Sequence, residues 1–143
     1  MNALMVITRA SLAGVAAAGV LALAGCAGME GGGAKLMLTG AQEVPPVTTS
    51  ASGSGTITVN ADKSVSGSVT TSGITATAAH IHRGAPGQNG PVIIPLTQNG
   101  DTWSVPAGAK LDDAQYDLYK AGNLYVNVHS ATNKGGEIRT QLK

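Results

Sequence analysis

The chain has 143 residues, with nine lysines and arginines against eight aspartates and glutamates, which gives a formal net charge of +1. Charge this sparse and evenly spread argues against nucleic-acid binding, which needs a basic stripe, and against electrostatic docking to anionic lipid head groups. The length fits one folded domain. There is no phenylalanine, one tryptophan and three tyrosines, so we expect a core made mostly of Val, Ile, Leu and Ala.

An uncharged apolar run from Ala10 to Ala24 follows Arg9 and ends in small residues. It is shorter than the roughly 20 residues that cross a bilayer, so it predicts a cleaved secretory signal rather than a membrane span. The only cysteine, Cys26, closes the sequence Leu-Ala-Gly-Cys. This sequence resembles the bacterial lipoprotein box, in which the cysteine is acylated and begins the mature chain. An ordinary signal peptide with an incidental cysteine is the alternative.

The lipoprotein interpretation divides the chain into a signal peptide at residues 1–25, a Gly-rich flexible tether at 26–34 and a folded domain at 35–143. Acyl chains such as palmitate on Cys26 would anchor the exported domain to the cell envelope. Ala27 follows the cysteine, where an aspartate would favour the inner membrane of a Gram-negative host. We therefore expect the outer membrane in such a host. With Cys26 acylated, no disulfide can form within the chain.

From residue 35 onward, short runs rich in Val, Ile and Thr alternate apolar and polar residues between Gly, Pro, Asn and Ser. This pattern is typical of an antiparallel all-β domain. We predict a Greek-key-like β-sandwich of about eight strands with one short helix. The predicted strands are 35–39, 55–60, 64–72, 77–82, 92–96, 101–105, 124–129 and 137–142.

The sequence also predicts the turns, loop and helix that connect these strands. Asn-Ala-Asp-Lys at 60–63 predicts a hairpin turn, and residues 84–91, with two prolines and three glycines, predict a longer loop. Residues 111–121 break the strand pattern, because Leu111, Ala114, Leu118 and Ala121 share one helical face. Asp112 or Asp113 can cap the start of this helix and Gly122 its end. We expect the helix to lie across an end of the sandwich.

All three histidines lie in predicted strands. His80 and His82 are two residues apart, so they point to one face of their strand while Ile81 points to the other. Alternation along 124–129 likewise places Val126 and Val128 in the core and Tyr125 and His129 on the opposite face. Along 137–142 it places Ile138 in the core. Three neutral imidazoles suit copper or zinc and leave an open coordination position. The alternative is a patch of surface histidines bonded to neighbouring polar groups, since a His-x-His pair is common on exposed strands.

The same alternation adds Asn127, Glu137 and Arg139 to this polar face. Glu43 precedes Val-Pro-Pro, which holds the backbone extended, and we expect it to dock against Arg139 or a histidine. A pair between Arg139 and Glu137 on an exposed edge would contribute about 0–1 kcal/mol. We predict no catalytic residue, because the sequence holds no Gly-x-Ser-x-Gly elbow and its Gly-rich segment leads into a strand, unlike a phosphate-binding loop.

Four segments, at 38–46, 79–92, 122–129 and 135–142, resemble in this order the CHRD domain, first described in chordin and widespread in microbial exported proteins. The resemblance spans about residues 35–143 and implies an all-β fold without implying an activity. The His-x-His strand also resembles that of copper, zinc superoxide dismutase, which needs more histidines and a disulfide. The CHRD motif residues map here to Glu43, His80, His82, Asn127, His129, Glu137 and Arg139.

Two functional hypotheses follow. The first is a lipid-anchored, non-enzymatic binding or structural module that meets an unidentified protein or small-ligand partner through the polar face and the 84–91 loop. The second is a mononuclear copper or zinc protein, either a metal carrier or a redox enzyme, with His80, His82 and His129 as ligands. The position of His129 discriminates between them, because it comes from a distant part of the chain.

Overall fold

The computed structural model describes residues 33–143, so the predicted signal peptide, Cys26 and most of the predicted tether lie outside the described part. No helix among the described residues is long and apolar enough to cross a membrane. The described elements are β1 (Lys35–Thr39), the 3-10 turn η1 (Gly40–Gln42), β2 (Ser52–Val59), β3 (Val65–Ser72), β4 (Ala76–Arg83), β5 (Val92–Pro95), β6 (Thr97–Asn99), β7 (Thr102–Ser104), α1 (Asp113–Lys120), β8 (Leu124–Ser130) and β9 (Ile138–Leu142).

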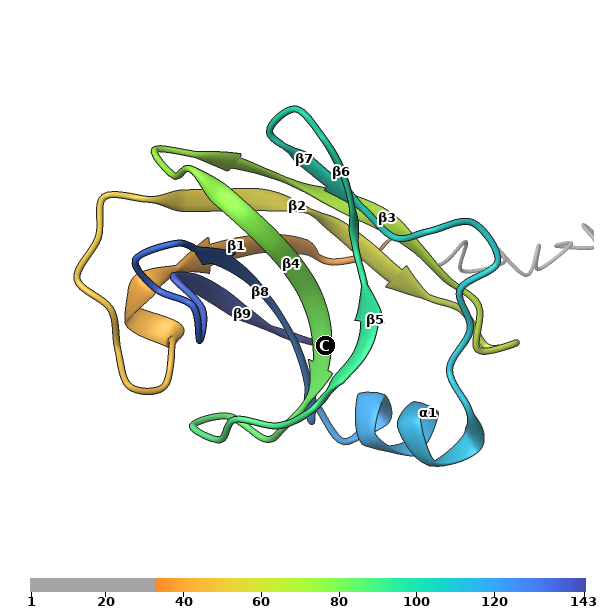
Figure 1. Cartoon of the computed structure of the whole chain (residues 1–143). Helices are drawn as coiled ribbons and strands as arrows, with labels where there is room; N and C mark the ends of the chain where they lie inside the picture. The colour runs from red at the N-terminus through yellow and green to blue at the C-terminus, as the bar shows by residue number, and fades with distance from the viewer. Residues whose placement is uncertain (1–32) are drawn as a thin grey trace, which may run out of the picture.

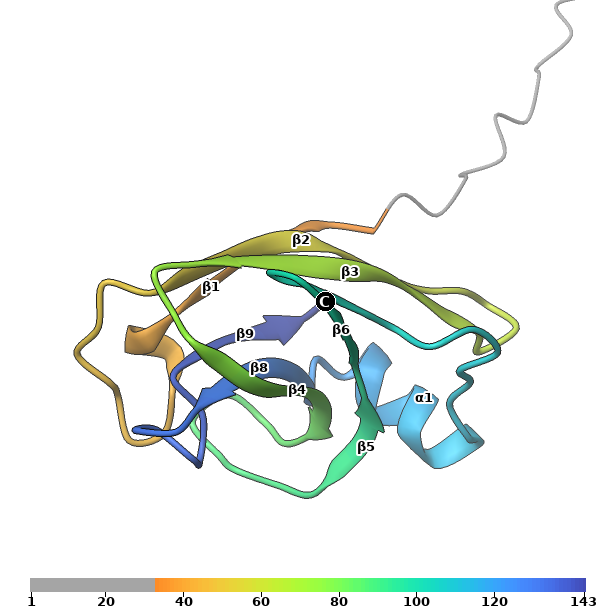
Figure 2. The same ribbon diagram turned by 45° about the horizontal axis from the view of Figure 1, so that its top comes forward.

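The strands form one antiparallel sheet in the order β5-β4-β8-β9-β1-β2-β3-β7-β6. The sheet curls over on itself, so that β2 and β3 lie across from β4 and β8 (Figures 1 and 2). The two outermost strands, β5 and β6, are separated in sequence by Leu96 alone. The chain therefore passes directly from one end of the sheet to the other. The predicted all-β antiparallel fold with one short helix is confirmed.

Residues 33–143 form nine strands, where the sequence predicted about eight. The missed strand, β6, consists of three exposed polar residues, so it carries no alternation signal. β2 begins at Ser52 rather than Gly55 because its Ser-Gly-Ser start, which also lacks an apolar signal, pairs with β1 as far as Thr39. The predicted turn at 60–63 joins β2 to β3, where Lys63 donates its backbone N–H to the Asn60 carbonyl over 2.9 Å.

The core lies between the two halves of the curled sheet. Ile81, Val126, Val128 and Ile138, all placed inward by alternation, are each at most 1% exposed. Trp103 adds the one large aromatic ring to a core that otherwise consists of aliphatic side chains and alanines. The strand period thus identified the inward positions correctly.

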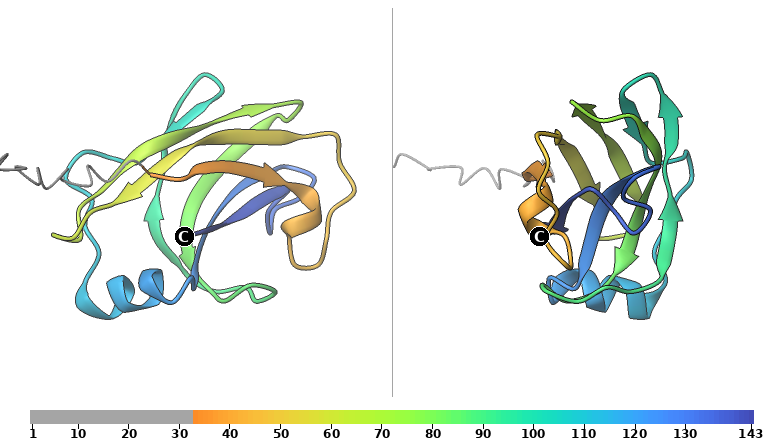
Figure 3. Two further views of the ribbon diagram at one scale, coloured as in Figure 1. Left: turned by 180° about the vertical axis from the view of Figure 1, so that it is seen from behind. Right: turned by 60° about the vertical axis from the view of Figure 1, so that its left-hand side comes forward.

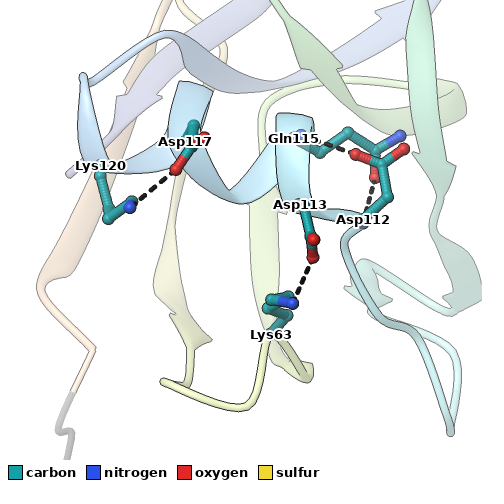
Figure 4. Close-up of polar contacts among 6 residues, drawn as sticks. All are labelled: Lys63, Asp112, Asp113, Gln115, Asp117 and Lys120. Carbon is teal, nitrogen blue, oxygen red and sulfur yellow. Dashed lines mark hydrogen bonds and ion pairs between the residues drawn. The ribbon is translucent and has the colours of Figure 1, made fainter.

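Helix α1 lies at one end of the curled sheet (Figure 3), within the predicted range 111–121. Asp112 is its N-cap: the Gln115 backbone N–H donates to Asp112 Oδ1 over 2.7 Å, and the Asp112 N–H donates to Gln115 Oε1 over 3.0 Å (Figure 4). This reciprocal pair is a capping box. An ion pair between Lys63 and Asp113 ties the helix to the β2–β3 turn. Leu111 is buried just before the cap rather than within the helix.

Candidate functional site

Strands β4, β8 and β9 are neighbours, and their register places polar residues in rows on the face away from the core. His80 lies opposite Asn127, which in turn lies opposite Arg139. The next row holds His82 opposite Tyr125. The rings of His82 and Tyr125 stack with centroids 4.7 Å apart. Side chains from three strands, distant in sequence, therefore form one polar cluster.

This outer face is covered, which corrects the expectation of an exposed polar surface. Asn127 and Arg139 are each 1% exposed, and Glu43 is 4% exposed. Three connections supply side-chain or backbone partners on this face: the segment after β1, the β4–β5 loop and the β8–β9 loop. Alternation shows which face a side chain occupies, but it does not show which other segments of the chain pack over that face.

Arg139 fastens the β4–β5 loop to the sheet. Its Nη2 donates to the carbonyls of Gln88, over 2.9 Å, and Ala85, over 3.3 Å, while Nη1 donates to Asn89 Oδ1 over 3.3 Å. The guanidinium also lies 3.5 Å from the centre of the Tyr125 ring, a cation–π arrangement. Arg139 is thus an interior anchor and not part of an exposed ion pair with Glu137.

The two glutamates predicted for this face have different surroundings. Glu137 is partly exposed, and its carboxylate accepts a hydrogen bond from Thr49 Oγ1 over 2.7 Å. Hydrogen bonding from Ser130 and from Thr49 lowers the pKa of Glu137. Burial instead raises the pKa of Glu43 to about 7, while the Arg139 charge and the Asn127 amide oppose the rise. Glu43 therefore lies near Arg139, whereas Glu137 lies away from it.

The raised pKa of Glu43 predicts a pH-dependent loss of stability in metal-free protein. Between pH 4.5 and 7 the folded carboxyl keeps a proton that the unfolded chain releases, so raising the pH favours unfolding. Across that window the loss is about 3 kcal/mol. Because the lowered pKa values of the histidines act in the opposite sense, the measurement is the difference in urea-unfolding free energy between wild type and Glu43→Gln at each pH. If the stability difference between wild type and Glu43→Gln does not change with pH, the raised pKa of Glu43 is contradicted.

The three histidines converge on one point of the outer face. Their ring centroids are 4.8 Å apart for His80 and His129, 5.5 Å for His80 and His82, and 6.0 Å for His82 and His129. One ring nitrogen from each lies within 4.8 Å of the other two. Shared zinc ligands would lie roughly 3–4 Å apart, so small ring movements suffice. Burial lowers the pKa of all three, and for His80 the other two histidines add to the effect.

Backbone carbonyls orient two of the three rings. The His82 Nδ1 lies 2.9 Å from the Gly90 carbonyl, and the His129 Nδ1 lies 2.9 Å from the Lys134 carbonyl. A carbonyl only accepts, so each Nδ1 carries the proton and each Nε2 holds a lone pair. His129 Nε2 lies 2.9 Å from His80 Nδ1. His82 Nε2 is buried and has no hydrogen-bond partner. Metal-ligating histidines are held in this way by their second nitrogen.

Comparison with known families adds one finding. The family model of the CHRD domain matches residues 35–142. The chain belongs to the CHRD-domain family. No curated protein and no solved structure matches it. The match runs from the start of β1 to the end of β9, so it includes every residue of the cluster on the outer face. The resemblance predicted from four short segments is therefore confirmed.

Several groups that contact the histidine cluster could not be predicted from the sequence. Gly90 and Lys134 act through backbone carbonyls, which any residue type supplies. Tyr125 was assigned only a face, yet it also accepts a hydrogen bond from the Gly90 N–H over 3.1 Å. Gln141 donates to the carbonyls of Gly84, over 2.7 Å, and Gly122, over 3.0 Å. The one hint in the sequence was the short separation between His82 and Gly90. A short loop returns the chain close to the strand from which it started, so Gly90 could be expected near His82.

Proposed function

We propose that this CHRD domain is a metal-binding module that holds one zinc or copper ion at His80, His82 and His129. The observation that carries the proposal is the pair of carbonyl-oriented rings, which leaves an unpartnered lone pair on the buried His82 Nε2. A purely structural cluster would pair this nitrogen with a donor, because an unpaired buried polar atom costs about 1–3 kcal/mol.

The donor set suits the proposed ion. Neutral imidazole is the ligand form, and it favours zinc, copper and related ions over magnesium or calcium. The lowered pKa values keep these rings neutral at pH 7, so no proton has to leave before the ion binds. His80 is only partly buried, which leaves an approach to the cluster from solvent. The chain's own residues therefore bind and orient the ion, and no chemical step is assigned to them.

Zinc should stabilise the folded domain by mass action. At free zinc one hundred times its dissociation constant the gain is about 2.7 kcal/mol, which corresponds to a melting temperature roughly 10 °C higher. His129→Ala should abolish the rise, whereas Arg83→Ala, an exposed change next to His82, should retain it. Differential scanning fluorimetry of protein without a His tag measures both. The same rise in wild type and His129→Ala would contradict the three-histidine site.

We further propose that the domain is exported and lipid-anchored through Cys26. The apolar run ending in Leu-Ala-Gly-Cys and the Gly-rich stretch after it support this assignment. Several acyl chains on one cysteine would anchor a domain of this size durably, since each buried CH₂ contributes about 0.8 kcal/mol. In a Gram-negative host, Ala27 at the position after the cysteine favours the outer membrane.

Loss of the acylated cysteine should release the domain. Cys26→Ala should leave the protein unprocessed or move the mature domain to the soluble fraction, because the acyl chains then have no attachment point. Fractionation and the mass of the mature N-terminus distinguish these states from the anchored wild type. A Cys26→Ala protein that is cleaved and membrane-bound like wild type would show that the anchor is elsewhere.

A further inference from the structure

Asn127 lies at the centre of the histidine cluster. It faces His80 across the β4–β8 pair and precedes His129 by two residues on the same face of β8. Its amide also lies within hydrogen-bonding reach of the His82 ring. The side chain is 1% exposed. Asn127 is therefore a neighbour of His80 and His82 and shares a strand face with His129.

The orientation of the Asn127 amide is fixed from its other side. Its Nδ2 donates to the Gly135 carbonyl over 3.3 Å. The Glu43 carboxyl lies on this side too, since a side chain at Gly136 would clash with both Asn127 Nδ2 and Glu43 Oε1. Turning the amide over would set its oxygen against the Gly135 carbonyl, and two acceptors cannot bond. The oxygen Oδ1 therefore points away from Gly135.

That oxygen has no hydrogen-bond partner. Asn127 Oδ1 and His82 Nε2 are both fully buried side-chain atoms without a donor, and they belong to neighbouring side chains. Each offers a lone pair, so neither can satisfy the other. A proton on His82 Nε2 would let that nitrogen donate to Asn127 Oδ1. While His82 is neutral, a metal cation bound between the two lone pairs satisfies both. An amide oxygen is a ligand more usual for magnesium, calcium or manganese, so the three imidazoles set the choice of ion and the oxygen completes the coordination shell.

We propose that Asn127 Oδ1 is the fourth ligand, so that three histidine nitrogens and one amide oxygen form a closed four-coordinate site for a divalent zinc or copper ion. The inference rests on the three-histidine site proposed above. Closed four-coordinate sites are typical of metals that are held, whereas catalytic sites keep a position open for substrate. A closed site therefore specifies a metal-holding module and argues against the redox-enzyme alternative.

Cobalt(II) substitution with azide as the probe tests whether a position is open. The visible spectrum of bound cobalt reports its ligands, and azide alters it only by entering the coordination shell. We expect the spectrum of the wild-type cobalt protein to stay unchanged on adding azide. The spectrum of Asn127→Ala should shift with azide, because the deleted oxygen leaves a vacant position in the same surroundings. Its zinc affinity should fall at least about 10–100-fold, the loss known for partners outside the first ligand shell.

Each outcome separates the two proposals. An azide-induced shift in the wild-type protein, or none in Asn127→Ala with bound cobalt, would overturn the fourth ligand and leave the three-histidine site standing. Failure of folded wild-type protein to bind cobalt or zinc would overturn the site itself. If Asn127→Ala does not fold, Asn127→Asp replaces it. The spectrum of the cobalt-loaded Asp variant should stay unchanged on adding azide, and an azide-induced shift in it would again contradict the assignment.

Discussion

Replacing Arg139 with methionine should lower the free energy of unfolding by about 3 kcal/mol or more, because each hydrogen bond from a charged group contributes about 1.5–3 kcal/mol. The change keeps much of the side-chain volume but removes the donors to Gln88, Ala85 and Asn89. It also removes the cation from the Tyr125 ring. Urea denaturation measures the loss of stability.

The matched control is Arg83→Met, which makes the same chemical change at an exposed position at the end of β4. It should change stability by less than about 0.5 kcal/mol. Hydrogen exchange adds a local readout, since amides of the 84–91 loop should exchange faster in Arg139→Met only. Equal stability and equal loop exchange in the two variants would show that Arg139 does not anchor the loop.

Ile138→Ala should cost about 2–5 kcal/mol, the range for truncating a fully buried isoleucine. Ile138 is 0% exposed, and its Cδ1 lies 3.2 Å from where a Cβ on Gly53 would be. The side chain therefore packs β9 against the backbone of β2 and links two parts of the curled sheet. The melting temperature and the urea midpoint should both fall.

Ile93→Ala is the control for this truncation, because Ile93 is only partly buried on the outermost strand β5. The same lost atoms should cost less than half as much there, since less apolar surface leaves water on folding. A larger effect at Ile93 than at Ile138 would mean that the core is centred near β5 and not between the halves of the sheet.

Sequence periodicity located the core and the polar face but not what covers that face. Alternation depends on the pleat of a single strand, so it placed Val126 inward and Asn127 outward from local sequence alone. The covering of Asn127 depends on loops from elsewhere in the chain, which no local pattern encodes. For the same reason, the interior location of Arg139 was not foreseen, since charged residues are rarely fully buried unless paired.

The candidate site, too, could be predicted only in part from the sequence. His80 and His82 share a face by strand geometry, whereas the approach of His129 depends on the β4–β8 register that the fold supplies. The partners that orient the rings are backbone carbonyls of Gly90 and Lys134. Side-chain chemistry can be predicted from residue types, but backbone acceptors become identifiable only when the loops that carry them are placed in space.

The 84–91 loop serves both the fold and the site. Arg139 holds it from β9, and its Gly90 carbonyl orients His82. Any change that releases the loop should therefore also free the His82 ring and weaken metal binding. Arg139→Met tests this coupling directly, since it removes no ligand and yet should lower the affinity for zinc.

The most direct measurement is the metal content of protein made without a His tag, stripped with a chelator, reloaded with zinc or copper and desalted. Elemental analysis should find about one ion per folded wild-type chain, as a single site with three histidine ligands requires. His82→Ala and His129→Ala should retain almost none, while Arg83→Ala should match wild type. Wild-type protein that is folded but holds far less than one ion per chain would contradict the account.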